Sequence, residues 1–152
     1  MFDALVAGAS VSLLNIAIHA AAMSALVRAL ASRIVTAFHR SAMVRLVVIM
    51  VTSVAVLMAA HILEVWVWSQ LYRLLGVAPA TADQFAFAFV NYTTLGYGNV
   101  LPEPQWEVIG PMTAMNGVLL FGWSTAVLFQ VLSVSYKELD RQIQRVDPDR
   151  AT

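Results

Sequence analysis

The peptide from Asn91 to Asn99 contains the residue types needed to bind a cation through main-chain oxygens. Gly96 and Gly98 lie on either side of Tyr97 within it. Glycines permit positive φ, which can turn successive carbonyl groups to the same side. A column of carbonyl oxygens can replace the hydration shell of a cation, with one chain supplying one oxygen at each level. A complete ring therefore requires several copies of the chain around an axis.

Two polar residues, His61 and Glu64, interrupt a long apolar stretch at helical spacing. One interpretation is functional: the two residues form a pH-sensitive pair or a contact behind the cation-binding peptide. The other interpretation, which we favour, is a buried hydrogen-bonded pair that orders the subunit. Two donors three residues apart do not complete a metal site. Asn15 and His19 are four residues apart in an earlier apolar stretch, and we expect them to bond to another helix.

Three apolar stretches that we expect to be membrane helices surround these residues. They run from Ala4 to Val27, from Leu46 to about Trp68 and from Val108 to Tyr136, and each is long enough to cross a bilayer. The 152-residue chain is 60% hydrophobic and 12% charged, whereas about a quarter of the residues in soluble domains are charged. Backbone groups in lipid must bond within their own segment, so the composition predicts an all-α membrane protein.

Basic residues indicate which ends of these helices are cytoplasmic. The loop between the first two stretches carries arginines but no acidic residue, and the tail carries four basic residues balanced by four acidic ones, which the positive-inside rule does not count. The positive-inside rule places both in the cytoplasm, with the N-terminus outside. We expect the aromatic residues beside the outer segment to anchor the headgroup layer: Trp66, Trp68, Tyr72 and Trp106.

A short helix is predicted directly before the cation-binding peptide. Thr81 and Gln84 have the spacing of a capping box, with Thr81 as N-cap, and the apolar run from Phe85 to Val90 follows. A helix ending at Tyr92 has about 11 residues and spans roughly 16 Å. This is too short to cross a bilayer, so we expect the helix to enter the membrane and turn back.

The segment Thr93-Thr94-Leu95-Gly96-Tyr97-Gly98 resembles the selectivity filter of the potassium-channel pore-module family. The resemblance extends from about Leu46 to Tyr136 and implies an outer helix, a re-entrant pore helix, a filter and an inner helix in a tetrameric pore. It implies that K⁺ binds the main-chain carbonyls of Thr94, Leu95, Gly96 and Tyr97 and the Thr94 hydroxyl, with Gly98 completing the filter.

Two residues depart from the pattern of this family. Leu95 stands where valine is usual, and we expect its longer side chain to affect packing behind the filter. Asn99, at the pore mouth, stands where aspartate is usual, which removes an anionic group. We expect a weaker cation-concentrating field and altered filter stability, but retained selectivity.

The resemblance also bears on the inner helix. Gly117 lies 19 residues after Gly98, where many members of the family have a hinge. It serves either as that hinge or as a helix-packing residue. Phe121 and Thr125 lie four and eight residues further on, near one face, and we expect them to line the inner cavity.

These observations predict three parts: residues 1–45 as an N-terminal membrane helix with a basic loop, 46–136 as the pore module and 137–152 as a cytoplasmic tail. We expect a homotetramer in a bacterial plasma membrane that conducts K⁺ passively, with lipids as its surroundings, no cofactor and no nucleic-acid partner. A weakly selective cation channel and a non-conducting membrane interaction subunit remain alternatives. The sequence shows no nucleophile–base pair or nucleotide loop, so an enzyme is not predicted.

Overall fold

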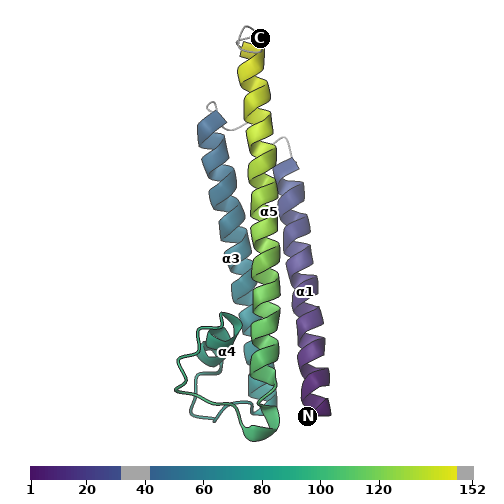
Figure 1. Ribbon diagram of the computed structural model, residues 1–152, viewed down its shortest axis with the longest axis vertical. Coiled ribbons are helices and arrows are strands. Elements are labelled where there is room, and N and C mark those ends of the chain that lie inside the picture. Colours follow the sequence, from purple (N-terminus) through teal and green to yellow (C-terminus); the bar gives the residue numbers. More distant parts are fainter. Residues whose placement is uncertain (32–41, 147–152) are drawn as a thin grey trace.

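The computed structural model describes residues 1–31 and 42–146 and consists of helices and their connections. Three long helices run side by side: α1 (Phe2–Ala31), α3 (Ala42–Leu75) and α5 (Ile109–Val146) (Figure 1). Between α3 and α5 the chain forms the short helix α4 (Gln84–Tyr92) and the 3-10 turn η1 (Pro104–Trp106). The described residues include no β-strand.

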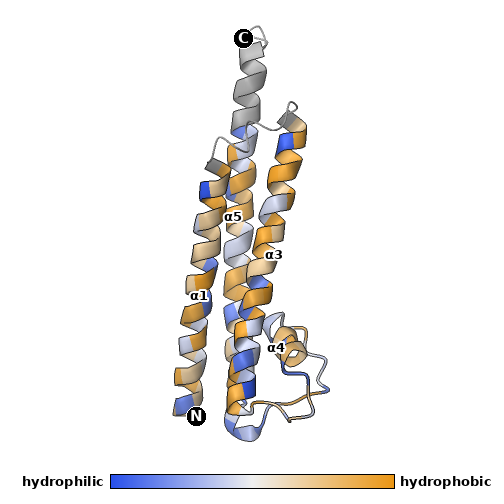
Figure 2. Cartoon of the chain, turned by 180° about the vertical axis from the view of Figure 1, so that it is seen from behind, coloured by the Kyte–Doolittle hydropathy of each residue, from blue (hydrophilic) through white to orange (hydrophobic). Residues whose placement is uncertain are grey.

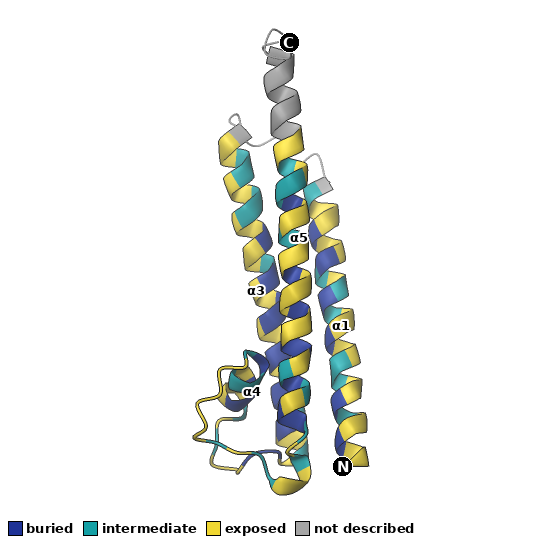
Figure 3. Ribbon diagram, in the orientation of Figure 1, coloured by how far each residue is buried: buried dark blue, intermediate teal, exposed yellow. Residues whose placement is uncertain are grey.

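All three long helices are long and apolar enough to cross a membrane, over Phe2–Leu30, Met43–Leu75 and Pro104–Lys137. Their outward faces are largely hydrophobic (Figure 2), and the buried residues lie where the helices face one another (Figure 3). Val51, Met58 and Ile62 of α3, for example, are exposed. Three long helices with apolar outward faces are suited to lipid, which confirms the prediction of an all-α integral membrane protein with three spans.

The ends of the helices divide the molecule into two sides. The N-terminus and the connection that contains α4 lie at one end, and the end of α5 lies at the other (Figure 1). Of the arginines expected in the cytoplasmic loop, Arg33 and Arg40 lie outside the described residues. The predicted boundary between the pore module and the tail lies after residue 136, but the helix α5 continues through it without interruption. The division of the chain into three parts stays a prediction.

Two of the aromatic residues expected at the headgroup layer lie in the core instead. Trp68 and Tyr72 are each 0% exposed. The Trp68 indole Nε1 donates a hydrogen bond to Asn116 Oδ1 (3.0 Å), and the Tyr72 hydroxyl bonds to Thr113 Oγ1 (2.8 Å). The prediction of interfacial anchoring was wrong for this pair, because partners on α5 satisfy their polar atoms and allow the rings to be buried.

Polar residues also connect α1 to the other two long helices. The side-chain amide of Asn15 donates to the Glu64 carbonyl (3.2 Å) and to Asn116 Oδ1 (3.1 Å). Asn15 and Asn116 are both buried. The prediction that Asn15 bonds to another helix is confirmed, and these bonds fix α1 against the α3–α5 pair.

The start of α4 differs from the predicted capping box. Asp83, not Thr81, is the N-cap: one of its carboxylate oxygens accepts from the amides of Phe85 (2.9 Å) and Ala86 (3.1 Å). The Gln84 side chain donates instead to backbone carbonyls of the preceding loop, including Pro79 O (3.2 Å). An ionised carboxylate is a stronger acceptor than a hydroxyl and also suits the positive end of the helix dipole, so the helix begins two residues later than predicted.

Candidate functional site

The helix α4 ends inside the protein, and the predicted filter peptide begins at that buried end. Tyr92, its last residue, is 0% exposed. Beyond it, the amide of Thr94 donates to Asn91 O and the amide of Leu95 donates to Val90 O, both at 3.0 Å. These bonds satisfy carbonyls at the end of the helix, and the chain then continues in an extended, irregular form.

The backbone φ angle alternates in sign along the predicted filter peptide. Thr94, Gly96 and Gly98 have φ values of 59°, 63° and 76°, whereas Leu95 and Tyr97 between them do not have positive φ. Such alternation turns successive carbonyls toward one side of the chain. The glycines adopt positive φ without a steric penalty, but Thr94 is β-branched and is strained in this region. Strain of this kind concentrates at functional sites.

The main-chain oxygens of this peptide are free of partners. Within the described residues, no hydrogen bond is accepted by the carbonyl of any residue from 94 to 98. The peptide is also exposed in the single chain, with Leu95 at 56% and Tyr97 at 71%. Irregular backbone at membrane depth is tolerated only where protein or water covers it, which is a reason to expect a neighbour or an aqueous pore beside this peptide.

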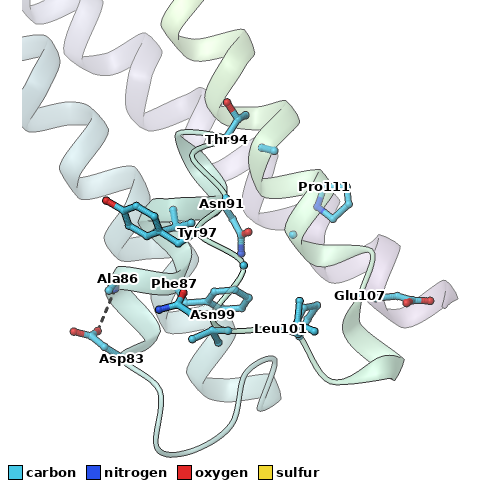
Figure 4. A pocket seen from close by; sticks show the side chains of 17 residues that line it. Asp83, Ala86, Phe87, Asn91, Thr94, Tyr97, Asn99, Leu101, Glu107 and Pro111 are labelled. Atoms are coloured by element: carbon cyan, nitrogen blue, oxygen red, sulfur yellow. Dashed lines mark hydrogen bonds between the residues drawn. The ribbon is translucent and has the colours of Figure 1, made fainter.

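A cleft of about 720 Å³ lies beside the peptide, between α4 and the start of α5. Figure 4 shows Thr94 and Asn99 toward opposite ends of the peptide, with Asn91 of α4 and Pro111 of α5 facing the same cleft. The cleft is lined by both halves of the predicted pore module. The short helix and the inner helix therefore position the peptide together.

On α5, Gly117 meets the end of α4. A Cβ atom at this position would lie 2.0 Å from the carbonyl oxygen of Tyr92, so the contact requires glycine. The helix runs through Gly117 without a break. This geometry supports the packing role of Gly117, and the hinge stays a prediction.

The other two predicted cavity residues lie further along α5. The ring of Phe121 packs against His61 (centroids 4.5 Å apart) and Tyr92 (5.4 Å). The Thr125 hydroxyl is exposed and donates to Phe121 O (2.9 Å). Their position in a pore cavity stays a prediction.

The buried residues beside the predicted filter peptide form a larger cluster than the sequence indicated. Glu64 lies between two histidines: Oε1 is 2.8 Å from His19 Nδ1, and Oε2 is 3.0 Å from His61 Nδ1. Tyr92 donates its hydroxyl hydrogen to Glu64 Oε2 (2.5 Å). The favoured interpretation, a buried hydrogen-bonded His61–Glu64 pair, is confirmed. Spacing along the chain did not reveal that His19, 42 residues before His61, completes it.

Comparison with known proteins places this geometry in a class. Residues 60–134 match the family model described as "Ion channel", which covers the second half of α3, α4, the filter peptide and most of α5. The match confirms the resemblance of this part of the chain to an ion-channel pore module.

Curated relatives agree over a shorter stretch. The chain is 33% identical over 60 residues to the voltage-gated potassium channel regulatory subunit KCNG2 of Homo sapiens, and equally to those of Rattus norvegicus and Gallus gallus. The match covers 39% of this chain but only 13% of the human protein and 12% of the other two. No solved structure gave a significant match.

Proposed function

We propose that the chain is a subunit of a potassium-selective channel in which four copies surround one pore and conduct K⁺ passively. The observation that carries the proposal is the peptide Thr94–Gly98, in which φ alternates and no carbonyl has a partner. Oxygens arranged in this way offer a dehydrated cation one ligand per level, and symmetry-related copies complete each ring. Thr94, Leu95, Gly96 and Tyr97 provide the K⁺ ligands in this proposal.

Exposure of the filter peptide supports assembly. Leu95 and Tyr97 are large side chains that one chain leaves uncovered at membrane depth. Neighbouring subunits would cover these side chains while leaving the carbonyl side toward the axis. With three spans, the basic loop and tail lie in the cytoplasm, and Asn99 and the N-terminus face outward.

A second candidate function is a non-conducting subunit that modulates another channel. The names of the curated relatives favour it, since all three are regulatory subunits. Such a subunit would contribute its filter peptide to a mixed assembly. It would carry no current as a homo-oligomer.

Reversal potentials distinguish these functions. The purified chain is reconstituted alone into a planar bilayer with K⁺ on one side and Na⁺ on the other. A current that reverses near the potassium equilibrium potential supports the selective channel. Reversal near zero indicates a weakly selective cation channel, as loosening of the filter by Asn99 or Leu95 would produce. The absence of current over a wide range of voltage and pH favours the regulatory subunit.

A further inference from the structure

We propose that His19, His61 and Glu64 form a binding site for a divalent transition-metal ion such as Zn²⁺, behind the filter. One ligand atom from each residue lies within 4.8 Å of the others. Two helices supply them, α1 for His19 and α3 for the other two. Imidazole nitrogen and carboxylate oxygen are ligands that Zn²⁺ accepts at about 2.0–2.2 Å.

Burial of the carboxylate is the first argument. Glu64 is 0% exposed, and within the described residues its side-chain partners are His19, His61 and Tyr92, with no lysine or arginine among them. Buried carboxylates are neutralised by a partner or coordinate a metal ion. A cation in contact with Glu64 is therefore expected, and the two imidazoles are placed to share it.

The hydrogen count of the cluster is the second argument. If both neutral imidazoles carry hydrogen on Nδ1 toward Glu64, both Nε2 atoms present lone pairs to Ser124 Oγ, at 2.9 Å from His61 and 3.3 Å from His19. Ser124 has one hydrogen and can satisfy only one of them. In any other assignment an Nδ1 atom presents its lone pair on the side of the carboxylate, and only for His61 can the Tyr92 hydroxyl, 2.9 Å from Nδ1, donate to that lone pair, which removes its hydrogen bond from Glu64 Oε2. Neutral imidazoles beside an ionised Glu64 thus leave either a contact between two lone pairs or a buried carboxylate oxygen without its hydrogen bond from Tyr92, and a bound cation relieves both.

The outer contacts suit a metal ion. If both Nε2–H groups donate to the two lone pairs of Ser124 Oγ, both Nδ1 atoms direct their lone pairs toward Glu64. Hydrogen bonds of this kind orient ligating histidines in metal proteins. Tyr92 bonds Glu64 Oε2 and lies 2.9 Å from His61 Nδ1, so its hydroxyl or a water is available for a fourth position.

The present distances require a small adjustment on binding. Two ligands of a tetrahedral Zn²⁺ are about 3.3–3.6 Å apart, as follows from bond lengths of 2.0–2.2 Å. The two nitrogen–oxygen distances to Glu64 are 2.8 Å to Oε1 and 3.0 Å to Oε2, so these two pairs separate by less than about 1 Å. The chosen ligand atoms of all three residues lie within 4.8 Å of one another, so the widest pair closes toward about 3.3–3.6 Å as the side chains turn toward a shared ion. The mixed nitrogen and oxygen set disfavours Mg²⁺ and Ca²⁺, which prefer oxygen ligands alone.

Calorimetric titration with ZnCl₂ tests the site without any measurement of current. The full chain is purified in detergent without a polyhistidine tag and stripped with a chelator. We expect one Zn²⁺ per chain, no comparable binding of Mg²⁺, and visible absorption bands of tetrahedral Co²⁺ when Co²⁺ replaces Zn²⁺. The third histidine, His39, lies outside the described residues, and His39→Ala is the matched control, which should bind as the wild type does.

The variants grade the contribution of each residue. His19→Asn and Glu64→Gln should lose the Co²⁺ bands and weaken Zn²⁺ binding by more than tenfold. Ser124→Ala, which alters only the outer contacts, should weaken it by about 10–100-fold. Size-exclusion chromatography identifies variants that fail to fold. Either of two results overturns the proposal. The first is a folded wild type that binds no Zn²⁺, which would mean that a proton provides the positive charge beside Glu64. The second is Zn²⁺ binding that survives His19→Asn and disappears with His39→Ala.

Discussion

At the scale of single residues, the proposed filter depends on backbone conformations that are unfavourable for residues with a side chain. Gly96 has φ of +63° and open space around the position of a Cβ atom, so substitution is opposed by backbone strain and not by a clash. An L-residue in the left-handed region costs roughly 1–2 kcal/mol. We expect Gly96→Ala to distort the carbonyl column and to abolish or degrade selective K⁺ conduction, measured by reversal potentials in bilayers.

Gly76 provides a matched control for this substitution. It has φ of +62° with nothing within 4 Å of the position that a Cβ atom would take, and it lies in the connection after α3, outside the filter. Gly76→Ala should therefore impose similar strain and keep potassium preference. Normal selectivity in Gly96→Ala, or equal loss in both variants, would contradict the assignment of the filter.

The role of Gly117 depends on the close approach of the Tyr92 carbonyl oxygen. Alanine at this position would place Cβ 2.0 Å from the Tyr92 carbonyl oxygen, and the backbone on both sides leaves little freedom to move. Overpacking typically costs about 1–3 kcal/mol. We expect Gly117→Ala to lower the thermal unfolding temperature of the detergent-solubilised protein.

Gly122 of the same helix separates packing from helix propensity. A Cβ atom added there would have no neighbour within 4 Å, so Gly122→Ala should leave the protein as stable as the wild type or stabilise it by up to about 1 kcal/mol. If Gly117→Ala unfolds at the wild-type temperature but changes channel opening, the hinge interpretation gains over packing.

At the scale of elements, the position of α4 depends on its N-cap. Asp83 accepts two amide hydrogens at the start of a helix of 9 residues, where each terminal bond is a large share of the total. Asp83→Ala should destabilise α4 by about 1 kcal/mol, whereas Asp83→Asn should preserve the cap because Asn is an equally good N-cap. Hydrogen exchange at Phe85 and Ala86 measures the effect, and equal protection in Asp83→Ala and wild type would contradict this role.

The elements themselves were predictable to different degrees. Apolar runs identified α1, α3 and α5, because lipid requires a long uninterrupted apolar segment. The start of α4 was misplaced because Thr81 and Asp83 both satisfy cap preferences, and only the three-dimensional path of the loop decides between them. The prediction of the filter peptide depended on its two glycines. The positive φ of Thr94 could not be predicted from the sequence, because β-branched residues normally avoid positive φ.

Long-range contacts explain what else the sequence left open. His61 and Glu64 were paired by helical spacing, but the approach of His19 depends on how α1 packs against α3. Trp68 and Tyr72 were assigned to the membrane surface from residue type alone. Their burial follows from Asn116 and Thr113 on α5, partners that lie more than 40 residues away.

At the scale of the whole molecule, the proposed orientation in the membrane leads to a prediction about sidedness. The N-terminus and the connection containing α4 share one end, and the end of α5 lies at the other. The lysines and arginines of the loop after α1 and of the tail, which are the residues that the positive-inside rule counts, predict that the second end lies in the cytoplasm. Because the chain contains no cysteine, single cysteines report sidedness without background. Substitution of acidic or neutral residues keeps the lysines and arginines that set the orientation.

We expect Asp3→Cys and Ala80→Cys to react with a membrane-impermeant maleimide applied to intact cells, and Glu138→Cys to react only after the membrane is permeabilised. Ala80 is exposed in the connection before α4, and Asp3 lies in the first turn of α1. Labelling of all three variants after permeabilisation serves as the control for reactivity. The reverse pattern would show an inverted orientation with the filter at the cytoplasmic side, and labelling of Ala80→Cys without Asp3→Cys would mean that α1 does not cross the membrane beside α3 and α5.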